Sequence, residues 1–115
     1  MVPEALEIFN RQHGCMALSA ITVAELVHGA EKSCRPEQNL AVVEDFCSRL
    51  AILPYGEREA FHYGSIRATL ERLGQPIGVN DLHIAAHARA QGLTLVSNKL
   101  RQFERVPGLL TENWI

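Results

Sequence analysis

The sequence lacks a strong net charge, a paired set of cysteines and any long apolar run. The net charge of −2 gives no global attraction to nucleic acid, so a nucleic-acid binder of this composition needs a local basic patch. The cysteines Cys15, Cys34 and Cys47 lack metal-finger spacing and indicate reduced thiols of a cytoplasmic protein. The apolar runs are too short to span a bilayer, and no signal peptide follows Met1.

What is present has the composition of an ordinary globular protein. The 115 residues are 47% hydrophobic and 21% charged, which is enough to bury a sizeable core. The chain shows no linker, internal repeat or low-complexity segment. The sequence therefore predicts one domain that spans residues 1–115.

Segments with helical periodicity alternate with short apolar segments along the chain. Glycines at 14, 74 and 92 and prolines at 3 and 36 mark helix ends and starts. Helices are predicted at residues 3–13, at 22–32, from 36 through a stripe that ends at 50, at 57–73 and at 81–91 with Asn80 as N-cap. Strands are predicted at residues 15–19, near 52–54, at 93–97 and at 109–111. This alternation predicts an α/β domain with a parallel sheet.

Asp81 heads the apolar stripe of its predicted helix, which continues through Ile84, Ala85 and Ala88. An isolated buried carboxylate costs several kcal/mol unless it is paired or bound to a metal ion. The alternative is that Asp81 lies in the first helical turn and only complements the helix dipole.

Glu25 follows Thr22 by three residues, which is the spacing of a capping box at a helix start. In that interpretation its role is local. Glu25 also points away from the apolar stripe of its helix. It shares a face with Thr22 and Gly29, whose small side chains would let a ligand approach closely.

Three histidines invite comparison with a metal site. His83 and His87 are four residues apart, and His28 lies on an earlier helix. The glutamate of the zinc-protease motif is absent, because residue 84 is isoleucine. The pattern therefore favours histidines of the surface or the core.

Lys99, Arg101 and Arg105 form a small basic cluster after the predicted strand at 93–97. Such a cluster is typical of a phosphate contact or of solvated surface charge. The sequence alone leaves both interpretations open.

An ordered series of segments resembles the VapC toxins of the PIN-domain family. The resemblance runs from about residue 17 to the C-terminus. Its segments are residues 19–33 (SAITVAELVHGAEKS), 75–88 (QPIGVNDLHIAAHA), 95–98 (LVSN), 101–109 (RQFERVPGL) and 112–114 (ENW).

The resemblance implies a three-layer α/β/α fold with a central parallel sheet. It also implies an endoribonuclease that depends on Mg²⁺ or Mn²⁺, cuts structured RNA such as tRNA, and pairs with a small VapB-type antitoxin. Glu25 and Asp81 take the metal-binding positions, and Ser97 takes the Thr/Ser position that orients the site. Lys99 stands where many members carry an acid. It could pair with Glu25 or Asp81, or it could hold an RNA phosphate together with Arg101. A homodimer through the helix at 57–73 would follow the family.

The expected residue types suit this chemistry. Mg²⁺ prefers carboxylate oxygens, and a bound ion can polarise a phosphodiester and lower the pKa of an attacking water. The crevice beyond the carboxyl ends of parallel strands is where such sheets hold ligands.

The sequence departs from the family in one respect. Members open with a central strand that ends in an Asp-Thr-Asn triplet, and this sequence contains no such triplet. We therefore expect a truncated domain whose sheet lacks its first central strand and whose site lacks one acid. A start codon further upstream, a strand donated by another chain or an altered sheet would each repair the gap.

Two other readings compete with an active ribonuclease. The chain could be a catalytically inactive module or decoy that binds the antitoxin, because two acids alone hold Mg²⁺ poorly. It could also be a folded fragment without function.

Overall fold

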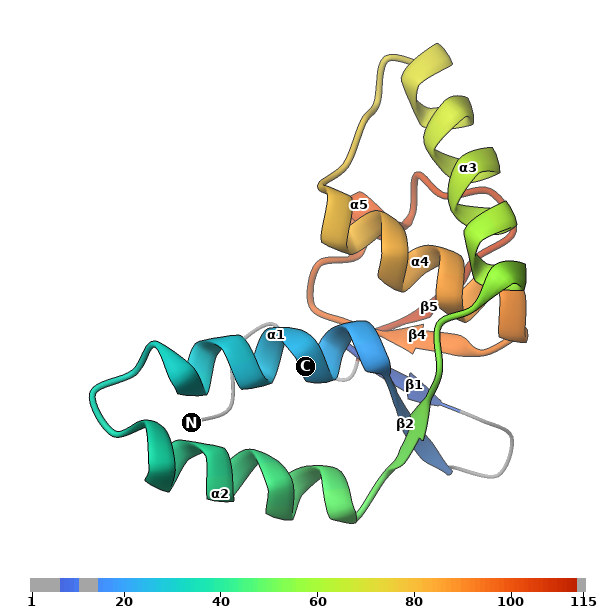
Figure 1. Cartoon of the computed structure of the whole chain (residues 1–115). Coiled ribbons are helices and arrows are strands. Elements are labelled where there is room, and N and C mark those ends of the chain that lie inside the picture. The colour runs from blue at the N-terminus through green and yellow to red at the C-terminus, as the bar shows by residue number, and fades with distance from the viewer. Residues whose placement is uncertain (1–6, 11–14, 114–115) are drawn as a thin grey trace.

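The computed structural model describes residues 7–10 and 15–113. Within them, the sheet has five strands in the order β3-β2-β1-β4-β5 (Figure 1). The elements are β1 Ile8–Asn10, β2 Met16–Ser19, α1 Ala20–Glu31, α2 Pro36–Ser48, β3 Ala51–Leu53, α3 Glu57–Arg72, α4 Val79–Gln91, β4 Thr94–Val96, α5 Leu100–Phe103 and β5 Leu110–Glu112.

The sheet is mixed, so the prediction of a parallel sheet is wrong. β1 lies at the centre and runs antiparallel to both β2 and β4, while β2–β3 and β4–β5 are parallel pairs. Residues 11–15 alone join β1 to β2, and so short a connection is compatible only with antiparallel pairing. The described sheet thus has a strand at its middle. The predicted absence of a first central strand is therefore not confirmed.

β1 also corrects the prediction of a helix at residues 3–13. Residues 8–10 form a strand, whereas residues 3–6 and 11–14 lie outside the described part of the chain. Phe9 is fully buried and pairs with Ala17 on one side and Leu95 on the other. Burial between two strands overrides the local helix signals, which carry little weight over so few residues.

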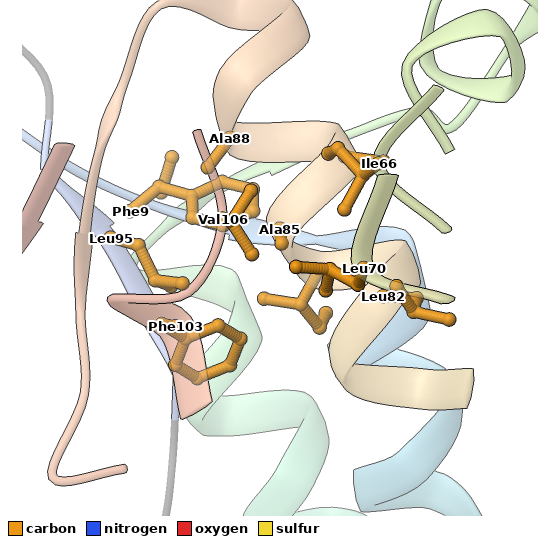
Figure 2. Packing of buried hydrophobic residues seen from close by; sticks show 12 residues of the cluster. Phe9, Ile66, Leu70, Leu82, Ala85, Ala88, Leu95, Phe103 and Val106 are labelled. Carbon is orange, nitrogen blue, oxygen red and sulfur yellow. The ribbon is translucent and has the colours of Figure 1, made fainter. Parts of the chain in front are cut away.

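The two faces of the sheet carry separate apolar clusters. Phe9, Ala17 and Leu95 point into a core with α3, α4 and the segment around α5 (Figure 2). Ile8 and Leu18, on the opposite face, pack with residues of α1 and α2. Helices therefore cover both faces, and Figure 1 shows α1 and α2 side by side, apart from α3 and α4. This arrangement agrees with the predicted α/β/α layering.

α1 and α4 each begin two residues before the predicted start, and the difference changes two roles. Ser19 caps α1, because its Oγ accepts a hydrogen bond of 3.0 Å from the N–H of Ile21. The predicted capping box is therefore wrong, and Glu25 lies within the helix. α4 begins at Val79 after Gly78, so Asn80 is a residue of its first turn and not its N-cap.

The remaining elements follow the sequence pattern. Pro36 opens α2, the long helix at 57–72 is present, and all predicted strands appear with slightly different ends. Phe103 and Val106 are buried after β4, as expected of packing residues. No helix in the described ranges combines the length and apolarity that crossing a membrane requires.

Candidate active site

An open pocket of about 540 Å³ lies where the start of α4 meets α1 and the segment after β4. It brings together Glu25 and Asp81, which are far apart in the sequence. Its lining residues are Glu7, Thr22, Glu25, Leu26, Gly78, Val79, Asn80, Asp81, Ile84 and Lys99. The two acids therefore share one cavity, as a joint metal site requires.

Asp81 enters this pocket from the first turn of α4. Its side chain is only 16% exposed. The positive end of the helix dipole stabilises a carboxylate at this place. Asp81 can therefore complement the helix dipole and also bind an ion in the pocket, because the first turn of α4 lies at the pocket.

Glu25 reaches the pocket from the middle of α1 and is exposed to solvent. Its Oε1 accepts a hydrogen bond from the side-chain amide of Asn80. This bond joins α1 to the first turn of α4 and orients the Glu25 carboxylate. Asn80 was missed as a site residue, because its sequence position suggested only a helix cap.

Lys99 places its ammonium group between two acids of the pocket. Its Nζ lies 3.6 Å from Oε1 of Glu7 and 3.8 Å from Oδ1 of Asp81. The Glu7 side chain is 12% exposed and the Lys99 side chain 41% exposed. The lysine thus links the acid before β1 to the acid that opens α4.

Burial and two neighbouring charged groups act on the pKa of Glu7. Burial raises the pKa of Glu7, the Lys99 ammonium lowers it, and the Asp81 carboxylate raises it. Glu7 and Asp81 therefore repel one another, with Lys99 as the compensating cation. Sequence reasoning missed Glu7 because it fell inside a predicted helix. Recognition of residues 8–10 as a strand would have placed it at a sheet edge.

Comparison with known proteins identifies the fold family. Residues 3–109 match the PIN domain. The chain belongs to the PIN-domain family. Over 112 residues it is 60% identical to "Ribonuclease VapC2" of Haemophilus influenzae strain Rd, covering 97% of this chain and 85% of that protein. Over 108 residues it is 53% identical to "tRNA(fMet)-specific endonuclease VapC" of Shigella flexneri, covering 94% and 82%.

Solved structures agree with this assignment. DNA-bound VapBC from Salmonella typhimurium has a TM-score of 0.82 at 55% identity, covering 84% of this chain and 74% of that chain. VapBC2 from Rickettsia felis, bound to a promoter DNA fragment, has a TM-score of 0.83 at 45% identity, covering 86% and 74%. This PIN domain is thus a ribonuclease of the VapC toxin type.

Ser97 of the PIN domain lies beside the pocket and does not line it. It is buried, and its N–H donates a hydrogen bond of 3.1 Å to the carbonyl of Glu112 in β5. Its Oγ accepts a hydrogen bond of 3.0 Å from the N–H of Lys99. Ser97 therefore fixes the backbone from which the Lys99 side chain extends.

The other two residues of the basic cluster lie outside the pocket. Arg101 is exposed on α5. Arg105 donates a hydrogen bond of 3.2 Å from Nη1 to the carbonyl of Pro76 and so ties down the loop before α4. Of the three basic residues, Lys99 alone faces the acids.

Two of the three histidines singled out in the sequence, His83 and His87, have structural partners. His83 Nδ1 lies 2.7 Å from the Tyr55 hydroxyl, and its ring stacks on Tyr63 with centroids 4.3 Å apart. His87 is fully buried, with Nδ1 2.6 Å from Oγ of Ser19. His28 is exposed on α1. The interpretation as surface or core histidines is confirmed.

The pocket suits a divalent cation by the kind of its donors. Carboxylate oxygens are what Mg²⁺ prefers, and the Thr22 hydroxyl is a buried lining group without a hydrogen-bond partner in the described ranges. The same ranges contain no group of three or more His, Cys, Asp or Glu side chains close enough to hold an ion. The oxygen donors are of the kind that suits a divalent cation, and the Lys99 ammonium lies in the same pocket.

Proposed function

We propose that this chain is an endoribonuclease toxin of a type II VapBC pair, dependent on Mg²⁺ or Mn²⁺. The observation that carries the proposal is that Glu25 and Asp81 line one pocket. The high identity to ribonucleases of the VapC type supports it. We extend the proposed domain over residues 1–115 and place its action in the cytoplasm, where RNA is available.

Each site residue has a proposed role. Asp81 and Glu25 would hold the ion, with the Asn80 amide orienting the Glu25 carboxylate. Ser97 orients the site through its hydrogen bond to the backbone of Lys99. A bound ion would supply a Lewis acid for the phosphodiester and a lowered pKa for an attacking water.

We propose RNA as the substrate, with tRNA as the first class to test. The relative from Shigella flexneri is named as a tRNA(fMet)-specific endonuclease. Lys99 and Arg101 are the proposed phosphate contacts, because both are cationic and Lys99 lies in the pocket itself. Contacts of this kind weaken as the salt concentration rises.

We propose a VapB-type antitoxin and a second copy of the chain as protein partners. The similar structures are VapBC complexes, which supports the antitoxin. Phe61 on α3 and Leu73 after it are 73% and 61% exposed, which supports a homodimer through this helix.

One observation favours a second candidate, a catalytically inactive module or decoy that binds the antitoxin. Lys99 already compensates the charge of Glu7 and Asp81. The sequence also contains no Asp-Thr-Asn triplet, and we propose that the pocket lacks the acid that this triplet brings to the site in the family. Weak metal binding and impaired cleavage would follow.

The deciding experiment is RNA cleavage by the purified chain with added Mg²⁺ or Mn²⁺, beside EDTA. We expect Asp81→Asn to lower the cleavage rate by about a hundredfold or more, as for loss of a group that stabilises the transition state. Asp45→Asn is the matched control, because Asp45 is an exposed acid on α2 that does not line the pocket.

Co-purification with the antitoxin separates the two candidates. Metal-dependent cleavage that Asp81→Asn abolishes, with antitoxin binding intact, supports the enzyme. Antitoxin binding by a wild-type chain that cleaves no RNA with either metal supports the inactive module and refutes the enzyme.

A further inference from the structure

We propose that Lys99 is a built-in competitor for the divalent cation, a tethered ammonium that must leave the acids before an ion can bind. The inference rests on the proposed metal-dependent function and deepens it. It makes Lys99 the residue that sets metal affinity in this chain.

The position of the ammonium carries the argument. Nζ of Lys99 contacts oxygens of Glu7 and Asp81 at 3.6 and 3.8 Å. These two acids lie on separate segments of the chain, and like charges that approach the same ammonium favour a cation between them. The lysine supplies that charge from within the chain. A metal ion and Lys99 therefore serve the same electrostatic need and exclude one another.

The backbone of Lys99 is fixed by a hydrogen bond, whereas its side chain is partly exposed to solvent. Its N–H donates to the buried hydroxyl of Ser97, while its side chain remains 41% exposed. Glu7 and Asp81 are far less exposed, at 12% and 16%. The ammonium can swing toward solvent on its four-carbon stem, whereas the acids stay in the pocket. Competition without unfolding is the expected consequence.

The lysine does not contact the polar groups that α1 contributes to the pocket. The Thr22 hydroxyl is buried, lines the pocket and has no hydrogen-bond partner in the described ranges. Glu25 lines the same wall and is bonded to Asn80 rather than to the lysine. The lysine thus compensates two acids but does not satisfy the oxygen donors on the α1 side of the pocket, which a hydrated cation in its place could reach.

Mn²⁺ binding to the full chain, measured by calorimetry and by the loss of the free-ion EPR signal, tests the inference. We expect Lys99→Gln to bind Mn²⁺ roughly tenfold more tightly than the wild type, since it removes a competing charge. Lys99→Arg keeps the charge and is expected to stay near the wild-type affinity. Arg101→Gln removes one charge from the same segment outside the pocket, and its Mn²⁺ affinity should change by less than about twofold.

Thermal unfolding adds a readout that does not depend on cleavage. Without metal, Lys99→Gln should melt below the wild type, and added Mn²⁺ should raise its melting temperature more than that of the wild type. Equal Mn²⁺ affinity in the wild type and Lys99→Gln would overturn the competitor role while leaving the metal-dependent function intact. Absence of Mn²⁺ binding in every variant, including Lys99→Gln, would overturn the metal-dependent function itself.

Discussion

Replacement of Phe9 by alanine tests the central strand directly. Phe9 is fully buried between β2 and β4, and its ring meets His87 edge-on with centroids 5.3 Å apart. Removal of a buried phenylalanine ring costs about 3–5 kcal/mol through lost transfer energy and the cavity left behind. With a stability of about 5–15 kcal/mol for a typical domain, this change removes a large share of the total.

Urea unfolding followed by circular dichroism measures this cost. At a slope of about 1–3 kcal/mol per molar urea, the midpoint should fall by roughly 1–5 M. Phe61→Ala is the matched control, measured on dilute, monomeric protein, because Phe61 is 73% exposed in the single chain and its loss should cost at most about 0.5 kcal/mol there. A Phe9→Ala cost no larger than that of Phe61→Ala would refute the placement of residues 8–10 at the centre of the sheet.

Two further predictions concern backbone conformation and pH. Gly92 closes α4 at φ 67°, so Gly92→Ala should destabilise the protein by about 1–2 kcal/mol, whereas Gly64→Ala within α3 should stabilise it by about 0.5–1 kcal/mol. Thermal melts of the two variants should therefore shift in opposite directions, and a shift of the same sign would contradict the assigned φ. Burial lowers the pKa of His87 below its ordinary 6.5, against the opposing effect of Glu59. Below about pH 6.5 the unfolded chain takes up a proton that native His87 resists. The free energy of unfolding should therefore decrease as the pH is lowered, and it should decrease less steeply in His87→Gln. Urea midpoints between pH 7.5 and 5.5 measure this slope, and equal slopes in both proteins would rule out the contribution of His87.

Much of the helical framework was predictable because its signals are local. The Pro36 start of α2 and the glycine after α4 act within one turn of the helix. Asp81 was also predictable, since its place ahead of an apolar stripe follows from helical periodicity. The hydrogen bond between Asn80 and Glu25 was not, because it joins residues of different helices.

The direction and place of β1 could not be predicted from local signals. Residues 8–10 are too few to carry a strong signal, and the strand preference of Phe9 alone does not outweigh the helix signals around it. Pairing with β2, the next strand in the chain, and with the distant β4 decides the outcome. The same cause hid Glu7, whose role depends on where β1 lies.

The reversed direction of β1 explains how Glu7 reaches the acidic pocket. β2 leads into α1 at Ser19, and β4 leads toward Lys99, so the carboxyl ends of both strands face the pocket edge of the sheet. A strand parallel to them would bring its last residue to that edge. β1 is antiparallel, with Ile8 opposite Val96, and it therefore brings the residue before its start, Glu7. Because β1 is antiparallel, the Glu7 carboxylate lies in the pocket with those of Glu25 and Asp81. In this sheet the added acid comes from the residue before the strand, whereas a parallel strand would supply it from its last residue.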